Sequence, residues 1–131
     1  MLSLRTSNFT STILKRSFTT STKRFAHLPG TSEAFKKHAI DGSKPVLVDF
    51  YADWCGPCRF LTPVLEKVIT DDCGVDLMKI DTEQEFELAQ KYKIRSLPTV
   101  MAFKNGQVIG QFIGAQQEPG VKKFLDEIKS K

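Results

Sequence analysis

The sequence predicts one α/β domain, in which a central mixed β-sheet is flanked by helices. Between residues 33 and 97, apolar stretches of strand type alternate with stretches of helical periodicity, an order typical of parallel strands joined by helices. From residue 99 a strand, the turn pair Asn105-Gly106 and a second strand at 108–113 follow directly, which predicts an antiparallel hairpin. The sheet is therefore expected to contain both parallel and antiparallel neighbours.

The first elements of the domain are a short helix, a strand and a longer helix. Ser32 is a plausible N-cap of the first helix, in which Phe35 and Ala39 share one face. The apolar and β-branched residues 46–51 predict a buried strand. Residues 57–69 follow with apolar side chains at helical spacing, so the chain turns from strand to helix between 51 and 57.

Residues 75–80 predict the next strand, and residues 83–92 the next helix, with Phe86 among its candidate inner positions. After the hairpin, Pro119 fits the first turn of a last helix. The apolar residues of that helix recur at helical spacing and predict one buried face: Val121, Phe124, Leu125 and Ile128.

Length and charge limit the possible functions. The chain has 131 residues, which suffices for one domain, and 40% of them are hydrophobic. Residues 33–131 hold 14 basic and 15 acidic side chains, so this part has no basic excess that would indicate nucleic acid. No run of 18 apolar residues indicates a membrane span. We expect a monomer without a nucleic-acid or membrane partner.

The N-terminal segment differs from the rest in composition. Eleven of the first 24 residues are Ser or Thr, five are Lys or Arg, and none is acidic, which is typical of an organellar transit peptide. Because arginine recurs along the segment, we expect residues 1–26 to be a cleaved, disordered mitochondrial transit peptide. Residues 27–131 are then the folded domain. The alternative is a disordered tail that carries no targeting signal.

The candidate site is the segment Trp54-Cys55-Gly56-Pro57-Cys58, between the strand and the helix. Cys55 falls at the helix N-terminus, where unpaired N–H groups and the helix dipole favour the reactive thiolate. Cys58 lies three residues further on and can close a short disulfide with it. Gly56 and Pro57 shape the turn, and nothing structural requires them between two inert cysteines. This pattern predicts a site that exchanges disulfides.

Two further observations refine this prediction. A zinc site would need a second pair of ligands, and only Cys73, His27 and His38 remain, without metal-like spacing. Asp49 is out of place within an apolar strand, and burial would raise its pKa so that it accepts a proton near neutral pH. The alternative for Asp49 is a strand-end carboxylate exposed to water.

The segment from Asp49 to Arg59 resembles the active-site segment of thioredoxins. The resemblance extends from about Phe35 to Lys129 and includes Leu97-Pro98-Thr99. It implies the thioredoxin fold and the activity of a protein-disulfide reductase. Further matching motifs are Lys79-Ile80-Asp81, Phe103-Lys104-Asn105-Gly106 and Gly114.

The resemblance also implies roles for individual residues. Cys55 is expected to be the nucleophile, Cys58 the resolving cysteine and Asp49 its proton acceptor, with Lys79 modulating Asp49. The Leu97-Pro98 bond is expected to be cis. The substrate site is expected to consist of Trp54, Leu97, Pro98 and Gly114, and an extended segment would bind there by short strand addition.

No bound cofactor is expected besides the redox-active disulfide between Cys55 and Cys58. NADPH is expected to act indirectly, through a thioredoxin reductase. The expected substrates are disulfide-containing proteins, such as peroxiredoxin or methionine sulfoxide reductase, within electron transport and redox homeostasis of the mitochondrial matrix. Gly-Pro between the cysteines favours a reductant over an oxidase or isomerase, where His is more usual. The alternative is a thioredoxin-fold binding subunit with incidental redox activity.

Overall fold

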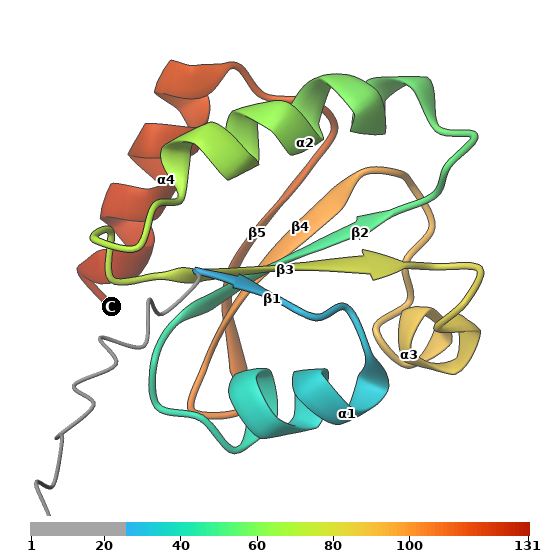
Figure 1. Ribbon diagram of the computed structural model, residues 1–131, viewed down its shortest axis with the longest axis horizontal. Helices are drawn as coiled ribbons and strands as arrows, with labels where there is room; N and C mark the ends of the chain where they lie inside the picture. Colours follow the sequence, from blue (N-terminus) through green and yellow to red (C-terminus); the bar gives the residue numbers. More distant parts are fainter. Residues whose placement is uncertain (1–25) are drawn as a thin grey trace, which may run out of the picture.

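The computed structural model of the protein describes residues 26–131 (Figure 1). The expected transit peptide therefore lies outside the described residues, except for Ala26. A five-stranded sheet with the strand order β1-β3-β2-β4-β5 forms the centre. The first three strands in this order are parallel, and the last two are antiparallel to their neighbours. The strands are β1 (His27–Leu28), β2 (Val46–Tyr51), β3 (Asp76–Asp81), β4 (Thr99–Lys104) and β5 (Gln107–Ile113).

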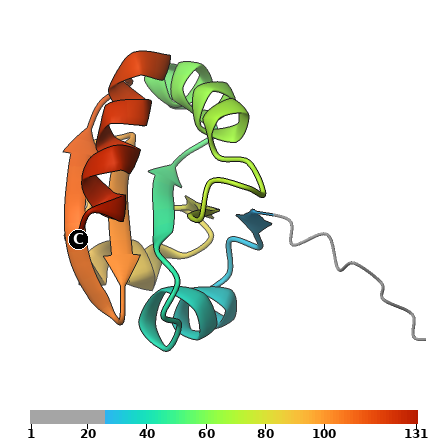
Figure 2. The same ribbon diagram turned by 90° about the vertical axis from the view of Figure 1, so that its left-hand side faces the viewer.

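Helices cover both faces of the sheet (Figures 1 and 2). Helices α2 (Gly56–Val68) and α4 (Glu118–Lys129) pack on one face. On the other face lie α1 (Ser32–Phe35), which continues into the π-helical segment Lys36–Ile40, and α3 (Phe86–Lys91). This arrangement confirms the predicted fold class. None of the helices within residues 26–131 is long and apolar enough to cross a bilayer.

Strand β2 is buried on both faces, and its alternation decides where Asp49 points. Successive side chains of a strand point to opposite faces of the sheet. Leu47 belongs to the core under α2 and α4, whereas Val48 and Phe50 belong to the core on the side of α1 and α3. Asp49 therefore faces α2, at the position of a core residue, and is 0% exposed.

The hairpin prediction is confirmed. Asn105 and Gly106 have φ values of 52° and 78°, the left-handed conformations that a two-residue type I′ turn requires. The turn joins β4 to β5 and leaves β4 between β2 and β5 in the sheet. The N-terminal end of β4, at Thr99, consequently lies next to the C-terminal end of β2.

Two local expectations were wrong. Thr31 caps α1 instead of Ser32, because its side chain accepts the N–H of Ala34 at 3.1 Å. The Ser32 hydroxyl donates to the carboxylate of Glu85. Phe86 is 59% exposed, because α3 begins only there and the four residues before it form a turn.

Candidate active site

The cysteine pair lies where β2 passes into α2. Cys55 is the N-cap of α2, and its Sγ accepts the backbone N–H of Cys58 at 3.2 Å. Pro57 occupies the first turn, where a missing N–H breaks no helical hydrogen bond. Cys55 and Cys58 form a disulfide, with Cα atoms 5.4 Å apart. When the disulfide is reduced, the N–H at this helix end can stabilise a Cys55 thiolate.

The two cysteines open onto different hollows, although each is only 2–3% exposed. Cys55 lines a groove of about 490 Å³ between the start of α2 and the α3 region, which we call the Cys55 groove. Cys58 lines a separate hollow of about 510 Å³, here called the Cys58 hollow, together with Tyr51, Arg59 and Thr62. A partner that occupies the Cys55 groove therefore meets Cys55 and not Cys58.

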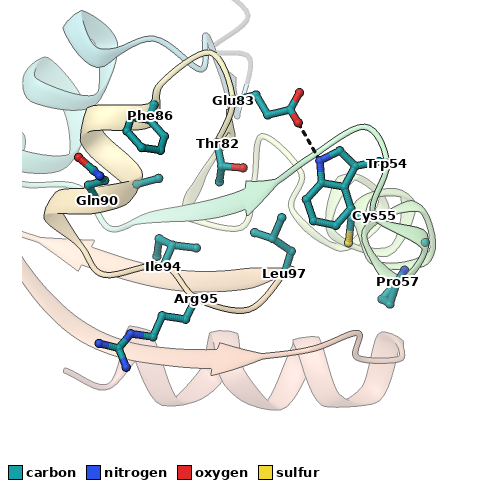
Figure 3. A pocket seen from close by; sticks show the side chains of 12 residues that line it. Trp54, Cys55, Pro57, Thr82, Glu83, Phe86, Gln90, Ile94, Arg95 and Leu97 are labelled. Atoms are coloured by element: carbon teal, nitrogen blue, oxygen red, sulfur yellow. Dashed lines mark hydrogen bonds between the residues drawn. The ribbon is translucent and has the colours of Figure 1, made fainter.

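The Cys55 groove combines exposed aromatic surface with fixed polar groups (Figure 3). Trp54 is 68% exposed, and its indole N–H donates to the carboxylate of Glu83 at 2.8 Å. Leu97 lies in the middle of the groove, between Ile94 and Cys55 in this view. The exposed ring of Phe86 lies at the α3 side. Such a surface suits a partner segment that presents apolar side chains beside its disulfide.

The loop before β4 borders the site and contains the cis-proline. The Leu97-Pro98 bond is cis, as expected. The carbonyl of Pro98 accepts the N–H of Gly114 at 2.9 Å. Gly114 has a φ of +92°, which explains the glycine, and a Cβ there would meet open space. Of the expected substrate residues, Trp54 and Leu97 line the Cys55 groove, whereas Pro98 and Gly114 do not.

Asp49 lies beneath α2 with its carboxyl fully buried. Its Oδ2 accepts the hydroxyl of Thr62 at 3.3 Å, and its Oδ1 has no partner among the described residues. Burial raises the pKa of Asp49 to about 6, against smaller lowering effects of the Thr62 hydrogen bond and the Lys79 charge. Asp49 is thus a buried carboxyl that gains or loses a proton near neutral pH, as the sequence predicts, and not a water-exposed one.

Lys79 stands beside Asp49 without binding it. The two residues are register partners on the parallel strands β3 and β2. The Lys79 ammonium, however, forms an ion pair with Glu66 of α2. Lys79 therefore lowers the pKa of Asp49 through space, while Glu66 raises it.

Sequence reasoning missed the residues that long-range folding brings to the site. Glu83 and Phe86 join the Cys55 groove from the segment after β3, and no local pattern marks them. Thr62 and Glu66 could have been recognised from the sequence, because they follow Cys58 at intervals of four residues in the helix and so share its face. Their polar side chains among the apolar inner positions of α2 could have indicated a buried partner.

The remaining candidate ligands stay apart. Cys73 is a free cysteine in a turn, and its thiol donates to the carbonyl of Val75 at 3.2 Å. The Nε2 atom of His27 lies 3.1 Å from the carbonyl oxygen of Ile69. Within residues 26–131, no group of three or more His, Cys, Asp or Glu side chains is arranged to hold a metal ion.

A cysteine pair at the start of a helix, beside a cis-proline loop and above a buried carboxyl, defines a thiol–disulfide oxidoreductase site of the thioredoxin type. The thioredoxin family model matches residues 26–127, which is most of the chain. The chain belongs to the thioredoxin family, whose members are thiol–disulfide oxidoreductases.

Curated relatives and solved structures agree with this membership. The mitochondrial thioredoxin of Bos taurus is 40% identical over 95 residues, which cover 72% of this chain and 57% of the relative. The thioredoxin of Rickettsia felis is 38% identical over 98 residues, covering 74% of this chain and 93% of the relative. The solved thioredoxin of Malassezia sympodialis is 33% identical with a TM-score of 0.69, covering 77% of this chain and 87% of that one. The matched segment thus spans little more than half of the mammalian mitochondrial relatives.

Proposed function

We propose that this protein reduces disulfides of other proteins with the Cys55/Cys58 dithiol. The observation that carries the proposal is the different setting of the two sulfurs: Cys55 lines the groove that displays exposed aromatic surface to a partner, whereas Cys58 lines a separate hollow. The N-cap position of Cys55 supports its role as the nucleophile, because the first thiol must be the reactive thiolate.

The proposed reaction has two exchanges. The Cys55 thiolate attacks one sulfur of the substrate disulfide, which forms a mixed disulfide and releases the first substrate thiolate. Cys58 then loses its proton to ionised Asp49 and attacks Cys55 Sγ, which releases the second substrate thiolate. Both substrate thiolates take up protons. Two electrons pass to the substrate, and the protein is left with the Cys55–Cys58 disulfide.

The protein must be reduced again before another turnover. We propose a thioredoxin reductase that draws its electrons from NADPH, as expected for the family, and disulfide-containing proteins such as peroxiredoxin or methionine sulfoxide reductase as clients. No prosthetic group is required, because the cysteine pair itself carries the electrons.

We also propose a mitochondrial location and removal of the N-terminal segment. Mitochondrial thioredoxins among the relatives support the location, although bacterial and chloroplast thioredoxins are similar too. Ala26 is 3% exposed, and its N–H donates to the Asp71 carboxylate at 2.8 Å. Its carbonyl accepts the N–H of Leu77 on β3. Cleavage before Ala26 would keep these contacts, so we shift the expected boundary by one residue.

The decisive experiment is reduction of insulin by the full chain with NADPH and a thioredoxin reductase. Turbidity of the reduced insulin should appear with the wild type and be absent with Cys55→Ser. A binding subunit with incidental redox activity would instead leave insulin intact and keep its partner after both cysteines are replaced.

A second experiment tests the proposed location. Residues 1–25 fused to a cytosolic reporter should carry it into mitochondria, and a reporter that stays in the cytosol would contradict the location.

A further inference from the structure

Helix α2 presents one polar stripe toward the sheet, below the cysteine pair. Cys58, Thr62 and Glu66 follow each other at intervals of four residues, so they lie on one side of the helix. Each of the latter two contacts one strand residue: Thr62 binds Asp49 on β2, and Glu66 binds Lys79 on β3. We call Asp49, Thr62, Glu66 and Lys79 the polar ladder.

The ladder separates two charges that the sheet brings together. Residues in register on parallel strands are neighbours on the same face, so Lys79 is placed to bind Asp49. A direct ion pair would hold the Asp49 carboxyl in its charged form and lower its pKa. Glu66 takes the ammonium instead, at a place where both side chains are more than one third exposed. Within the described part of the chain, Asp49 is left with a neutral hydroxyl as its only hydrogen-bond partner.

We propose that Thr62 and Glu66 are positioning residues for the second exchange. Thr62 orients the Asp49 carboxyl from the helical turn that follows Cys58, and Glu66 holds the Lys79 ammonium away from that carboxyl. Their effect on turnover rests on the proposed reductase function. Their effect on Asp49 itself does not, because the contacts exist in the oxidised protein without a substrate.

The Cys58 hollow links the ladder to the resolving thiol. Thr62 and Cys58 both line it, so the residue that binds Asp49 also borders the space next to Cys58. Thr62 is half-buried, whereas Asp49 behind it is 0% exposed. Thr62 therefore connects the hollow with the carboxyl, and its hydroxyl can keep one carboxylate oxygen fixed during proton transfer.

The groups around Asp49 define what each substitution should do. From α2, Thr62 favours the charged carboxylate and Glu66 disfavours it. From β3, Lys79 favours it. From β4, the register partner is Val100, which carries no charge. On β2 itself, Tyr51 has its phenol pKa raised, first by burial and also by Asp81 and Asp53, so it stays neutral near pH 6.

The test is a carboxyl-carbon NMR titration of Asp49 in the oxidised full-length protein. Thr62→Val removes the hydroxyl at nearly constant volume and should raise the pKa of Asp49 by about one unit. Thr62→Ser should restore the wild-type pKa. Glu66→Gln should lower it, because a negative charge is lost and Lys79 is released toward Asp49. Glu127→Gln on α4 changes the net charge equally at an exposed position and should have no effect.

A second readout connects the ladder to the reaction. The rate at which a mixed disulfide between Cys55 and a peptide thiol is resolved should be measured against pH. The pH at which this rate inflects should be higher in Thr62→Val, equal to the wild-type value in Thr62→Ser, and lower in Glu66→Gln. An unchanged Asp49 pKa in both Thr62→Val and Glu66→Gln would overturn the proposal, as would a shifted pKa with an unmoved inflection. A wild type that reduces no protein disulfide would overturn the proposed function, while the NMR titration would still decide the effect on Asp49.

Discussion

The two sides of the disulfide differ in the polarity and the exposure of the residues around them. On the Cys55 side, the groove displays large exposed rings, and the indole N–H of Trp54 has its acceptor in Glu83. On the Cys58 side, the polar ladder joins α2 to β2 and β3, and a buried oxygen of Asp49 has no hydrogen-bond partner within residues 26–131. Exposed apolar surface serves contact with another molecule, whereas an under-satisfied buried acid serves proton transfer. One short helix turn thus separates recognition from acid–base chemistry.

The largest expected effect is a difference between the two cysteine variants in the trapping of client proteins. Cys58→Ser should leave Cys55 able to attack a client but remove the intramolecular attack that releases it, so mixed disulfides accumulate. Cys55→Ser should trap nothing, because Cys58 does not line the groove. Non-reducing gels and intact-mass measurement after mixing with oxidised insulin would measure both variants. A Cys73→Ser background removes the free thiol as a source of adducts, and equal trapping by both variants would contradict the assignment of the nucleophile.

The next effect concerns Asp49, which should speed turnover at the expense of stability. Asp49→Asn removes the proton acceptor of Cys58 and should slow resolution of the mixed disulfide by about 10²-fold near pH 7. The same change should stabilise the oxidised protein, because a buried ionised carboxyl disfavours folding. Stopped-flow resolution and chemical denaturation of the same two proteins would give both values. A variant that is less stable, or that resolves at the wild-type rate, would contradict the role of Asp49.

The pH dependence of that stabilisation follows from the raised pKa. The carboxyl has a pKa of about 6 in the folded protein and about 4 when unfolded, so the folded state binds its proton more tightly. The penalty is therefore absent below pH 4, grows between pH 4 and 6, and is constant above pH 6. Its upper limit is about 3 kcal/mol, from two pKa units at 1.36 kcal/mol each. Asp49→Asn should match the wild type in stability below pH 4.

The comparison also explains which features the sequence could reveal. The cysteine pair, the helix that follows it and the hairpin at Asn105-Gly106 depend on neighbours in sequence, and these predictions are confirmed. Asp49 was recognisable because a charged residue interrupts an apolar strand. The exact cap of α1 was missed by one residue, because Thr31 and Ser32 are both good capping residues and only the backbone decides between them.

What the sequence could not reveal depends on register and on distant loops. The partner of Lys79 follows from how α2 lies across β2 and β3, and local sequence does not encode that placement. Glu83 reaches Trp54 across 29 positions of the chain. Strand β1 has only two residues, too few to show alternation, and exists because β3 offers it a free edge. Long-range pairing supplied these features in each case.

A smaller effect is expected from the hydrogen bond that holds Trp54. Glu83→Ala removes the acceptor of the indole N–H and should raise the KM for insulin several-fold with little change in kcat, because the exposed ring loses its fixed orientation. Glu83→Gln keeps an acceptor oxygen and should lie close to the wild type. Trp54 is the only tryptophan, so its fluorescence anisotropy reports the ring directly and should fall in Glu83→Ala. An unchanged anisotropy would mean that the bond does not hold the ring in solution.

The smallest expected effect separates two exposed phenylalanines on either side of the cysteine pair. Phe86 is 59% exposed and lines the Cys55 groove, whereas Phe60 is 76% exposed and lines a different hollow beside α4. Each ring already faces water, so Phe→Ala should change the free energy of unfolding by less than about 0.5 kcal/mol at either position. Phe86→Ala should raise the KM for insulin about two- to threefold, on the scale of one partly buried apolar contact, and Phe60→Ala should not. Equal changes in KM for both variants would show that clients cover the whole end of the molecule around Pro57, and that the Cys55 groove alone does not define recognition.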